Sequence, residues 1–139
     1  NEVGREGAMT WEQIEKLHQD GFTIACRGQS GRSLTRKTQG VPFEAYFKAV
    51  ESELRLARKA IETHLEAPCR FLAYPQGSTN NLVSAMAAKL GFYEAFTLSP
   101  GSNPFFADRF RIHRIAMDGS VKPEQFSNLL STMIAADLN

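Results

Sequence analysis

The sequence lacks any apolar run near the roughly 20 residues that cross a bilayer, and nothing at its amino end resembles a signal peptide. It also lacks a charge excess, because its formal net charge is only +1. A balance this close to zero gives no general reason to invoke nucleic acid as a partner. With 139 residues and 42% hydrophobic residues, the chain is predicted to form a single soluble domain over residues 1–139 without a membrane span.

Cysteine is equally scarce, since Cys26 and Cys69 are the only two in the chain. We expect Cys26 at the end of one strand and Cys69 at the start of another, which in a parallel sheet separates them by roughly 13 Å. A disulfide needs Cα atoms within about 7 Å of each other. Both cysteines are therefore predicted to be buried free thiols.

Helical and strand patterns alternate along the chain. Thr10 and Gln13 form a capping box before a short helix that ends at Gly21. Later apolar residues recur at helical spacing, and short apolar runs between the helices read as strands. Helices are predicted from Phe43 to Leu65, from Ser78 or Thr79 to Leu90, and from Pro123 to Ala136, and strands at Phe22–Ala25, Phe71–Tyr74, Ala95–Leu98 and Arg111–Ala116.

This alternation favours an α/β fold with a parallel sheet and outer helices. About four strands are too few to close a barrel, which takes eight strands in about 250 residues. The sequence therefore predicts part of a (β/α) barrel. An open parallel edge invites association, so we expect either a second copy of the chain or upstream strands to cover it.

Four segments, in this order, resemble the polysaccharide deacetylase family from about Met9 to Met117. They are Met9-Thr-Trp-Glu-Gln-Ile14 followed by Asp20-Gly-Phe-Thr-Ile24, the long helix that ends before Pro68, Arg70-Phe-Leu-Ala-Tyr-Pro-Gln-Gly77, and Leu90-Gly-Phe-Tyr-Glu-Ala-Phe-Thr97. The resemblance implies the carboxyl-terminal part of a distorted (β/α) barrel. It also implies a hydrolase that removes acetyl groups from the amino sugars of a polysaccharide.

In this family an aspartate and two histidines hold a divalent metal, usually zinc, and the histidines occur in a Ser-His-x-x-x-His pattern after an early strand. Here Cys26 aligns with the serine, Arg27 with the first histidine and Gly31 with the second. An arginine has no acceptor lone pair and a glycine has no side chain. We therefore predict no metal ligands and no cofactor in this chain, and a degenerate metal site.

The three histidines do not replace the missing pair. His18 and His64 fall in helices, where surface positions are expected. His113 lies in the last strand region, at a position that precedes the family's usual arginine. It is a weak candidate for the catalytic acid.

The resemblance further predicts substrate-binding residues. Because Pro75 has no N–H, Gln76 or Gly77 must supply any backbone donor to a substrate carbonyl. Alternatively, the Tyr-Pro-x-Gly element only shapes a tight turn, and Arg27 pairs with an acidic neighbour rather than with an anionic ligand. The predicted substrate-binding residues are Arg27, Arg70, Tyr74, Pro75, Gln76 and Gly77.

Three functions follow from this set of residues. The first is a degenerate deacetylase-like protein that binds a carbohydrate polymer or oligosaccharide. The second is a fragment of an active enzyme with a variant metal site, and the third is an interaction module that forms a homodimer through its open sheet edge. The family's polymeric substrates imply an extracellular or cell-envelope location.

Overall fold

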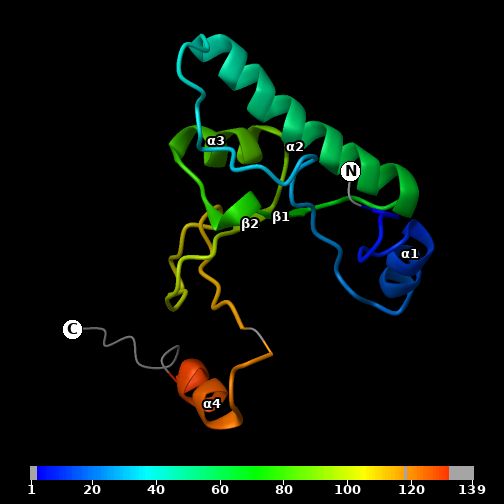
Figure 1. The fold of residues 1–139 in the computed structure, drawn as a ribbon, viewed down its shortest axis with the longest axis vertical. Coiled ribbons are helices and arrows are strands. Elements are labelled where there is room, and N and C mark those ends of the chain that lie inside the picture. The colour runs from blue at the N-terminus through cyan, green and yellow to red at the C-terminus, as the bar shows by residue number, and fades with distance from the viewer. Residues whose placement is uncertain (1–2, 118, 132–139) are drawn as a thin grey trace.

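The computed structural model describes residues 3–117 and 119–131. Figure 1 shows helices α2 and α3 together on one side of the two strands, α1 near the end of α2, and α4 apart from the other elements. A single turn of 3-10 helix, η1 (Pro75–Gly77), follows the first strand. The other elements are α1 (Trp11–Gln19), α2 (Phe43–Leu65), β1 (Phe71–Ala73), α3 (Asn81–Lys89), β2 (Glu94–Phe96) and α4 (Pro123–Ser131).

The sheet is parallel, as the sequence predicts. β1 pairs with β2 so that Leu72 lies opposite Ala95. Isolated parallel bridges continue the arrangement on both sides, from Cys26 to Leu72 and from Phe96 to Ile112. Four chain segments thus run side by side in one direction, and the partial barrel does not close.

The two outer strands are shorter than predicted. Instead of strands at Phe22–Ala25 and Arg111–Ala116, the described chain forms one bridge at Cys26 and one at Ile112. Each outer segment has a strand neighbour on one side only, and Phe22 is 60% exposed rather than buried. A segment that pairs with a strand on one side only, and whose side chains are exposed, has few interactions that stabilise it as a regular strand.

Helix α1 forms as its capping pattern predicts. The Gln13 amide donates to the Thr10 hydroxyl at 3.3 Å, and the Gln13 side chain accepts from the Thr10 amide at 2.9 Å. Gly21 ends the helix with a φ of 91°. Such a positive φ strains most other residues, which explains why glycine stands there.

Helix α2 supplies most of the helical side of the core. Its predicted apolar face is buried at Val50, Leu54 and Ala57, whereas Phe43 at its first turn is 60% exposed. Tertiary packing begins at Tyr46 and Phe47, which are partly buried against the core, so Phe43 alone of the predicted face stays largely in solvent. The core that α2 covers also contains Leu72, Tyr74, Val83, Met86, Ala87, Phe92 and Ala95.

Helix α3 begins later than predicted. Its cap is Asn80, not Ser78 or Thr79, because the Asn80 side chain accepts a hydrogen bond from the Val83 amide at 2.9 Å. Ser78 and Thr79 connect η1 to Asn80, and their hydroxyl groups do not cap the helix. Gly91 then ends the helix with a φ of 80°, as expected.

Helix α4 begins at Pro123 as predicted, but its apolar face is not buried. Phe126 is 47% exposed and Leu130 is 45% exposed, so the prediction that they face the core is wrong. The predicted continuation to Ala136, including Met133, lies outside the described residues.

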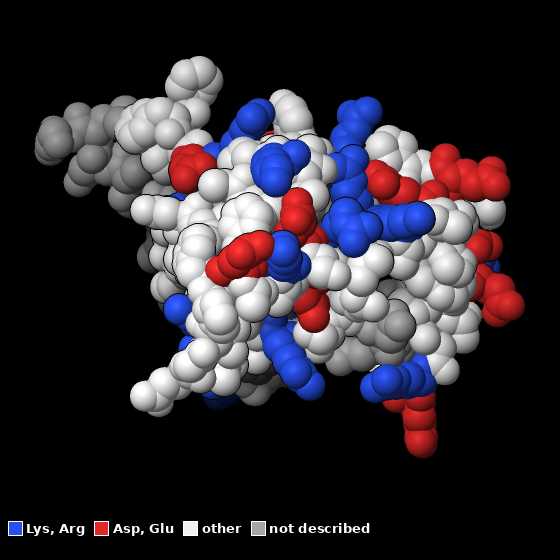
Figure 2. All heavy atoms as spheres, turned by 90° about the horizontal axis from the view of Figure 1, so that it is seen from above, with Lys and Arg blue, Asp and Glu red and all other residues white. Residues whose placement is uncertain are grey.

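Charged residues are mixed in sign on the face that carries α2. Figure 2 shows acidic and basic side chains interspersed there. Ion pairs join Lys48 to Glu44 at 2.7 Å, Arg58 to Glu62 at 2.8 Å, and Lys89 to Glu51 at 3.3 Å. No helix in the described part of the chain has the length and apolar character to cross a bilayer.

The two cysteines are free and buried, as predicted. Their thiols lie close enough to affect each other's pKa, so the predicted separation of roughly 13 Å is too large. Cys26 pairs with Leu72 rather than with the end of β1, and the Cys69 thiol turns toward the Phe71 carbonyl. The interaction with the Cys69 thiol, together with burial, raises the pKa of the Cys26 thiol far above its ordinary value.

Candidate functional site

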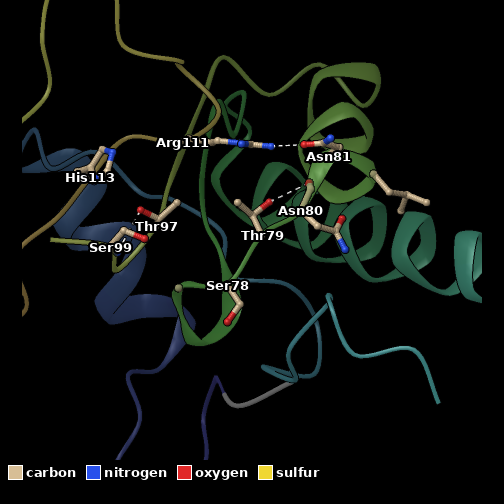
Figure 3. A pocket seen from close by; sticks show the side chains of 10 residues that line it. Ser78, Thr79, Asn80, Asn81, Thr97, Ser99, Arg111 and His113 are labelled. Atoms are coloured by element: carbon tan, nitrogen blue, oxygen red, sulfur yellow. Dashed lines mark hydrogen bonds between the residues drawn. The ribbon is translucent and has the colours of Figure 1, made fainter. Parts of the chain in front are cut away.

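A cavity of about 880 Å³ lies where β1, β2 and the Ile112 segment end. These are the carboxyl ends of parallel strands, where α/β proteins assemble their binding sites. Figure 3 shows the side chains that line the cavity. Most of them are uncharged and polar, namely Ser78, Thr79, Asn80, Asn81, Thr97 and Ser99, and they are joined by Gly77, Leu82, Arg111 and His113.

The turn after β1 forms one wall of this cavity. Gly77 adopts a φ of 68°, and a Cβ there would come within 2.6 Å of the Leu98 backbone nitrogen and closer still to the Leu98 side chain. Only glycine combines this conformation with so close an approach. The turn therefore brings the chain after β2 directly against the chain after β1, and it leads Ser78 and Thr79 to the cavity.

Backbone hydrogen bonds fix the opposite wall. The Thr97 amide donates to the Ile112 carbonyl at 2.8 Å. The side chain of Asn103 clamps His113, because its Oδ1 accepts from the His113 amide at 2.8 Å and its Nδ2 donates to the His113 carbonyl at 3.0 Å. Arg111 and His113, two residues apart on one extended segment, thereby both reach the cavity.

Two nitrogen-bearing side chains differ from the rest of the lining. Arg111 donates from Nη2 to the Asn81 side-chain oxygen, and its Nε lies 3.6 Å from Asp108 Oδ2. His113 Nδ1 is buried and has no hydrogen-bond partner in the described part of the chain. Unpaired buried polar atoms are costly, and this nitrogen is packed beside Gly101, where a Cβ would come within 3.1 Å of it.

The predicted residues of the Tyr-Pro-x-Gly element divide between core and surface. Tyr74 is 1% exposed, and its hydroxyl donates to the Phe110 carbonyl at 2.9 Å. Burial raises the pKa of the Tyr74 hydroxyl. Pro75 is buried as well, so both residues support the turn, and of this element Gly77 lines the cavity.

Gln76 stands at the exposed tip of the same turn. Its φ of 56° is unusual for a residue with a side chain, and backbone strain of this kind often marks functional turns. The Gly77 amide already donates to the Tyr74 carbonyl at 2.8 Å. The Gln76 amide makes no hydrogen bond within residues 3–117 and 119–131, so of the two predicted donors it is the available one.

Arg27 lies elsewhere. With Gly31 it lines a separate cavity of about 460 Å³ between α1, α2 and the segment that ends at Cys26. No ion pair to Arg27 occurs in the described chain, so the alternative that it pairs with an acidic neighbour is not observed. The loop after Arg27 is held by Glu53, whose Oε2 accepts from the Gln29 amide at 3.1 Å and the Ser30 amide at 2.9 Å.

Arg70 lies at the opposite end of the sheet, before the first residue of β1. It lines a third cavity of about 220 Å³ near His18 and Cys69. The structure therefore does not bring Arg27, Arg70 and Gly77 into one site.

Sequence reasoning missed most of the polar lining. A short apolar strand followed by the polar run Ser78-Thr79-Asn80-Asn81 could have indicated a wall of hydrogen-bonding groups, but it reads equally well as a helix cap. No local pattern marks Thr97, Ser99 or Arg111. Their position at the cavity depends on the parallel pairing of Phe96 with Ile112, which brings residues that are distant in sequence to the same end of the sheet.

Comparison with known proteins identifies the class of this fold. Residues 2–95 match the model of the family described as polysaccharide deacetylase. The match covers more than half of the 139 residues, and the chain therefore belongs to the polysaccharide deacetylase family, as the sequence resemblance implies. No curated protein gives a significant match.

Solved structures of deacetylases share the fold. The chain superimposes on the deacetylase PplD from Streptococcus pyogenes with a TM-score of 0.78 and 20% identity, covering 94% of this chain and 53% of that one. A polysaccharide deacetylase from Bacillus cereus gives 0.75 and 20%, with coverage of 93% and 39%. IcaB from Ammonifex degensii gives 0.69 and 20%, with coverage of 96% and 58%. The chain thus spans about half, or less, of the length of these proteins.

The residues that the sequence resemblance aligns with the family's metal ligands do not fit a zinc ion. A catalytic zinc site takes three protein ligands from histidine, cysteine or carboxylate side chains. The side chains of Arg27 and Gly31 offer no lone pair, and Cys26 is a thiol that is 1% exposed. Within the described chain, no three such side chains come together in a way that could hold a metal ion.

Proposed function

We propose that this protein binds N-acetylated amino-sugar polymers or oligosaccharides in the cavity at the carboxyl ends of its strands. The cavity itself carries this proposal. It holds about 880 Å³, and hydroxyl and amide side chains, which pair well with sugar hydroxyl groups, make up most of its wall. Membership of the polysaccharide deacetylase family supports the same class of ligand.

We also propose that the chain does not carry out the family's metal-dependent hydrolysis. That reaction needs a metal-activated water, and Arg27 and Gly31 occupy the positions of the aligned histidines. The proposed role is therefore recognition rather than cleavage, and a fragment of an enzyme with a variant metal site is the alternative.

Beside the cavity, the Gln76 amide is proposed to bind the carbonyl oxygen of an acetamido group. It is the available backbone donor of the turn, next to Gly77, which lines the cavity. An N–H that is already held in position loses little conformational entropy when a ligand binds. Pro75 on its amino side keeps the turn rigid, since its φ is fixed by its ring.

Calorimetric titration with a chitin hexamer, run beside metal analysis and an acetate-release assay, tests the proposal. We expect saturable binding of the hexamer, no stoichiometric zinc and no acetate above the uncatalysed rate. Absence of binding overturns the recognition role. Stoichiometric zinc together with acetate release supports the variant enzyme instead.

Two further parts of the proposal concern assembly and location. The segment that ends at Cys26 pairs with β1 on one side, and a second copy of the chain is proposed to cover its other side. A solution mass of one chain by light scattering would contradict the homodimer. An extracellular or envelope location is proposed because polysaccharide polymers lie there, and fractionation of cells that express the full gene tests it.

A further inference from the structure

We propose that the cavity prefers acidic amino-sugar polymers, whose sugars carry carboxylates, and that Arg111 recognises the carboxylate. This inference rests on the proposed function, because it names the class of carbohydrate that the same cavity takes. It concerns specificity only, and it requires no metal and no cleavage.

The charge of the lining is the first observation. Arg111 is the one residue with a permanent charge among the described residues that line the cavity, and neither aspartate nor glutamate lines it. A wall of neutral hydroxyl and amide groups does not repel an anion. The cavity thus presents a single fixed positive charge within polar surroundings that suit sugar hydroxyl groups.

The position of the guanidinium is the second observation. Figure 3 shows Arg111 extending toward Asn81, whose side-chain oxygen accepts from Nη2. This hydrogen bond joins the last strand segment to the start of α3 and holds the guanidinium plane in one orientation. A guanidinium held in place binds a planar carboxylate with two parallel hydrogen bonds at less entropic cost than a free one.

The third observation is that this charge is poorly neutralised. The nearest carboxylate oxygen of Asp108 lies 3.6 Å from Nε, and the two side chains are 44% and 56% exposed. The other oxygen of Asp108 already accepts from the Phe110 amide at 2.9 Å. An exposed ion pair of this kind contributes little energy, and Nη1 has no partner among the residues that the structure describes. The guanidinium therefore retains capacity for an anionic ligand.

Arg109 provides a matched control. It belongs to the same stretch, but its guanidinium lies over the rings of Tyr93 and Phe110, at 5.8 and 5.1 Å, and it does not line the cavity. Removal of its charge changes the net charge of the protein as much as removal of that of Arg111. A general attraction of anions to a basic surface would therefore respond equally to both substitutions.

Calorimetric titration with two size-matched probes tests the inference. One is a neutral chitin oligosaccharide, and the other is a hyaluronan oligosaccharide, in which N-acetylglucosamine alternates with glucuronate. For the unmodified chain we expect about tenfold tighter binding of hyaluronan at low salt, as charge-assisted hydrogen bonds confer, and a smaller preference as added salt screens the charge. Arg111→Gln should abolish the preference, so that it weakens hyaluronan binding about tenfold more than it weakens chitin binding. Arg111→Lys should retain part of the preference, and Arg109→Gln should retain all of it.

The outcomes separate the two levels of the proposal. Equal binding of both probes by the unmodified chain, or equal losses in Arg111→Gln and Arg109→Gln, would overturn the acidic preference and leave carbohydrate binding intact. Failure of both probes to bind would overturn the proposed function and this inference together. Thermal unfolding of each variant separates the two causes of a loss of binding. A variant that unfolds at the temperature of the unmodified chain has lost recognition, whereas one that unfolds earlier has lost stability.

Discussion

The carboxylate of Glu53, in the middle of α2, accepts a hydrogen bond from the backbone amide of Ser30 at 2.9 Å, and its same oxygen accepts from Gln29 at 3.1 Å. One side chain of the longest helix thus fixes the loop that follows Cys26. The loop keeps a defined path because a carboxylate supplies the acceptor that two adjacent amides need.

Glu53→Ala should loosen this loop. Two amides lose a charged acceptor, and we expect a destabilisation of about 1–3 kcal/mol with faster hydrogen exchange at Gln29 and Ser30. Glu44→Ala is the control, because the Glu44 side chain is 77% exposed and pairs only with Lys48. Urea unfolding and exchange by NMR measure the difference, and equal effects of the two substitutions would contradict the assigned role.

Gly77→Ala should be severely destabilising. The new methyl group meets the backbone and side chain of Leu98, and the φ of 68° adds strain. We expect a loss of about 2–4 kcal/mol and weaker binding in the cavity. Gly40→Ala separates strain from crowding, because Gly40 has a φ of 81° with nothing within 4 Å of its Cβ position. That control should lose only about 1 kcal/mol in chemical denaturation.

Tyr74 makes stability depend on alkaline pH. Burial raises the pKa of its hydroxyl in the folded state, so the folded chain holds this proton more tightly than the unfolded chain. The resulting stabilisation is complete below the unfolded pKa of about 10 and is lost as the pH rises from there through the folded pKa. Stability measured against pH should therefore fall above about pH 10.

Tyr74→Phe tests this origin. It should cost about 1–3 kcal/mol at neutral pH, since the Phe110 carbonyl loses its donor, and it should flatten the alkaline decline. Tyr93→Phe, at a residue that is 57% exposed, should alter neither quantity appreciably. An unchanged decline in Tyr74→Phe would assign the pH dependence to other groups.

The thiols should be unreactive in the native protein. Cys26 and Cys69 are each 1% exposed, and the raised pKa of Cys26 keeps it protonated. A thiol-specific chromogenic disulfide should find essentially no reactive cysteine in the native chain at about pH 8 and both cysteines after unfolding in denaturant. If unfolding without reductant exposed no thiol, the protein would contain a disulfide and the free pair would be excluded.

The order of elements was predictable because each helix carries its own local signals. Thr10 with Gln13, Pro42, and Gly91 mark helix ends through hydrogen bonds and backbone conformations that involve only near neighbours. The parallel sheet followed from the alternation of helices and apolar runs. The family resemblance, carried by ordered segments, agreed with the family match and with the fold of the solved relatives.

The site was less predictable because it depends on register. Arg27 and Arg70 were grouped with Gly77 on the basis of motif positions, yet they line three different cavities. Arg111 reaches the cavity only because Ile112 pairs with Phe96, a contact between segments that no local pattern specifies. Cys26 likewise pairs with Leu72 in the middle of β1, and not with the end of β1, which places its thiol nearer to that of Cys69 than the sequence predicts.

The walls of the cavity at the carboxyl ends of the strands come from chain segments that are each paired into the sheet. Leu72, Ala95 and Ile112 hold their places through main-chain pairing, while Ser78, Thr79 and Ser99 lie beyond the paired positions. Their identities can thus be varied without disturbing the pairing beneath. A library randomised at these three positions and displayed on phage would yield this scaffold with many different cavity linings, each with the same core.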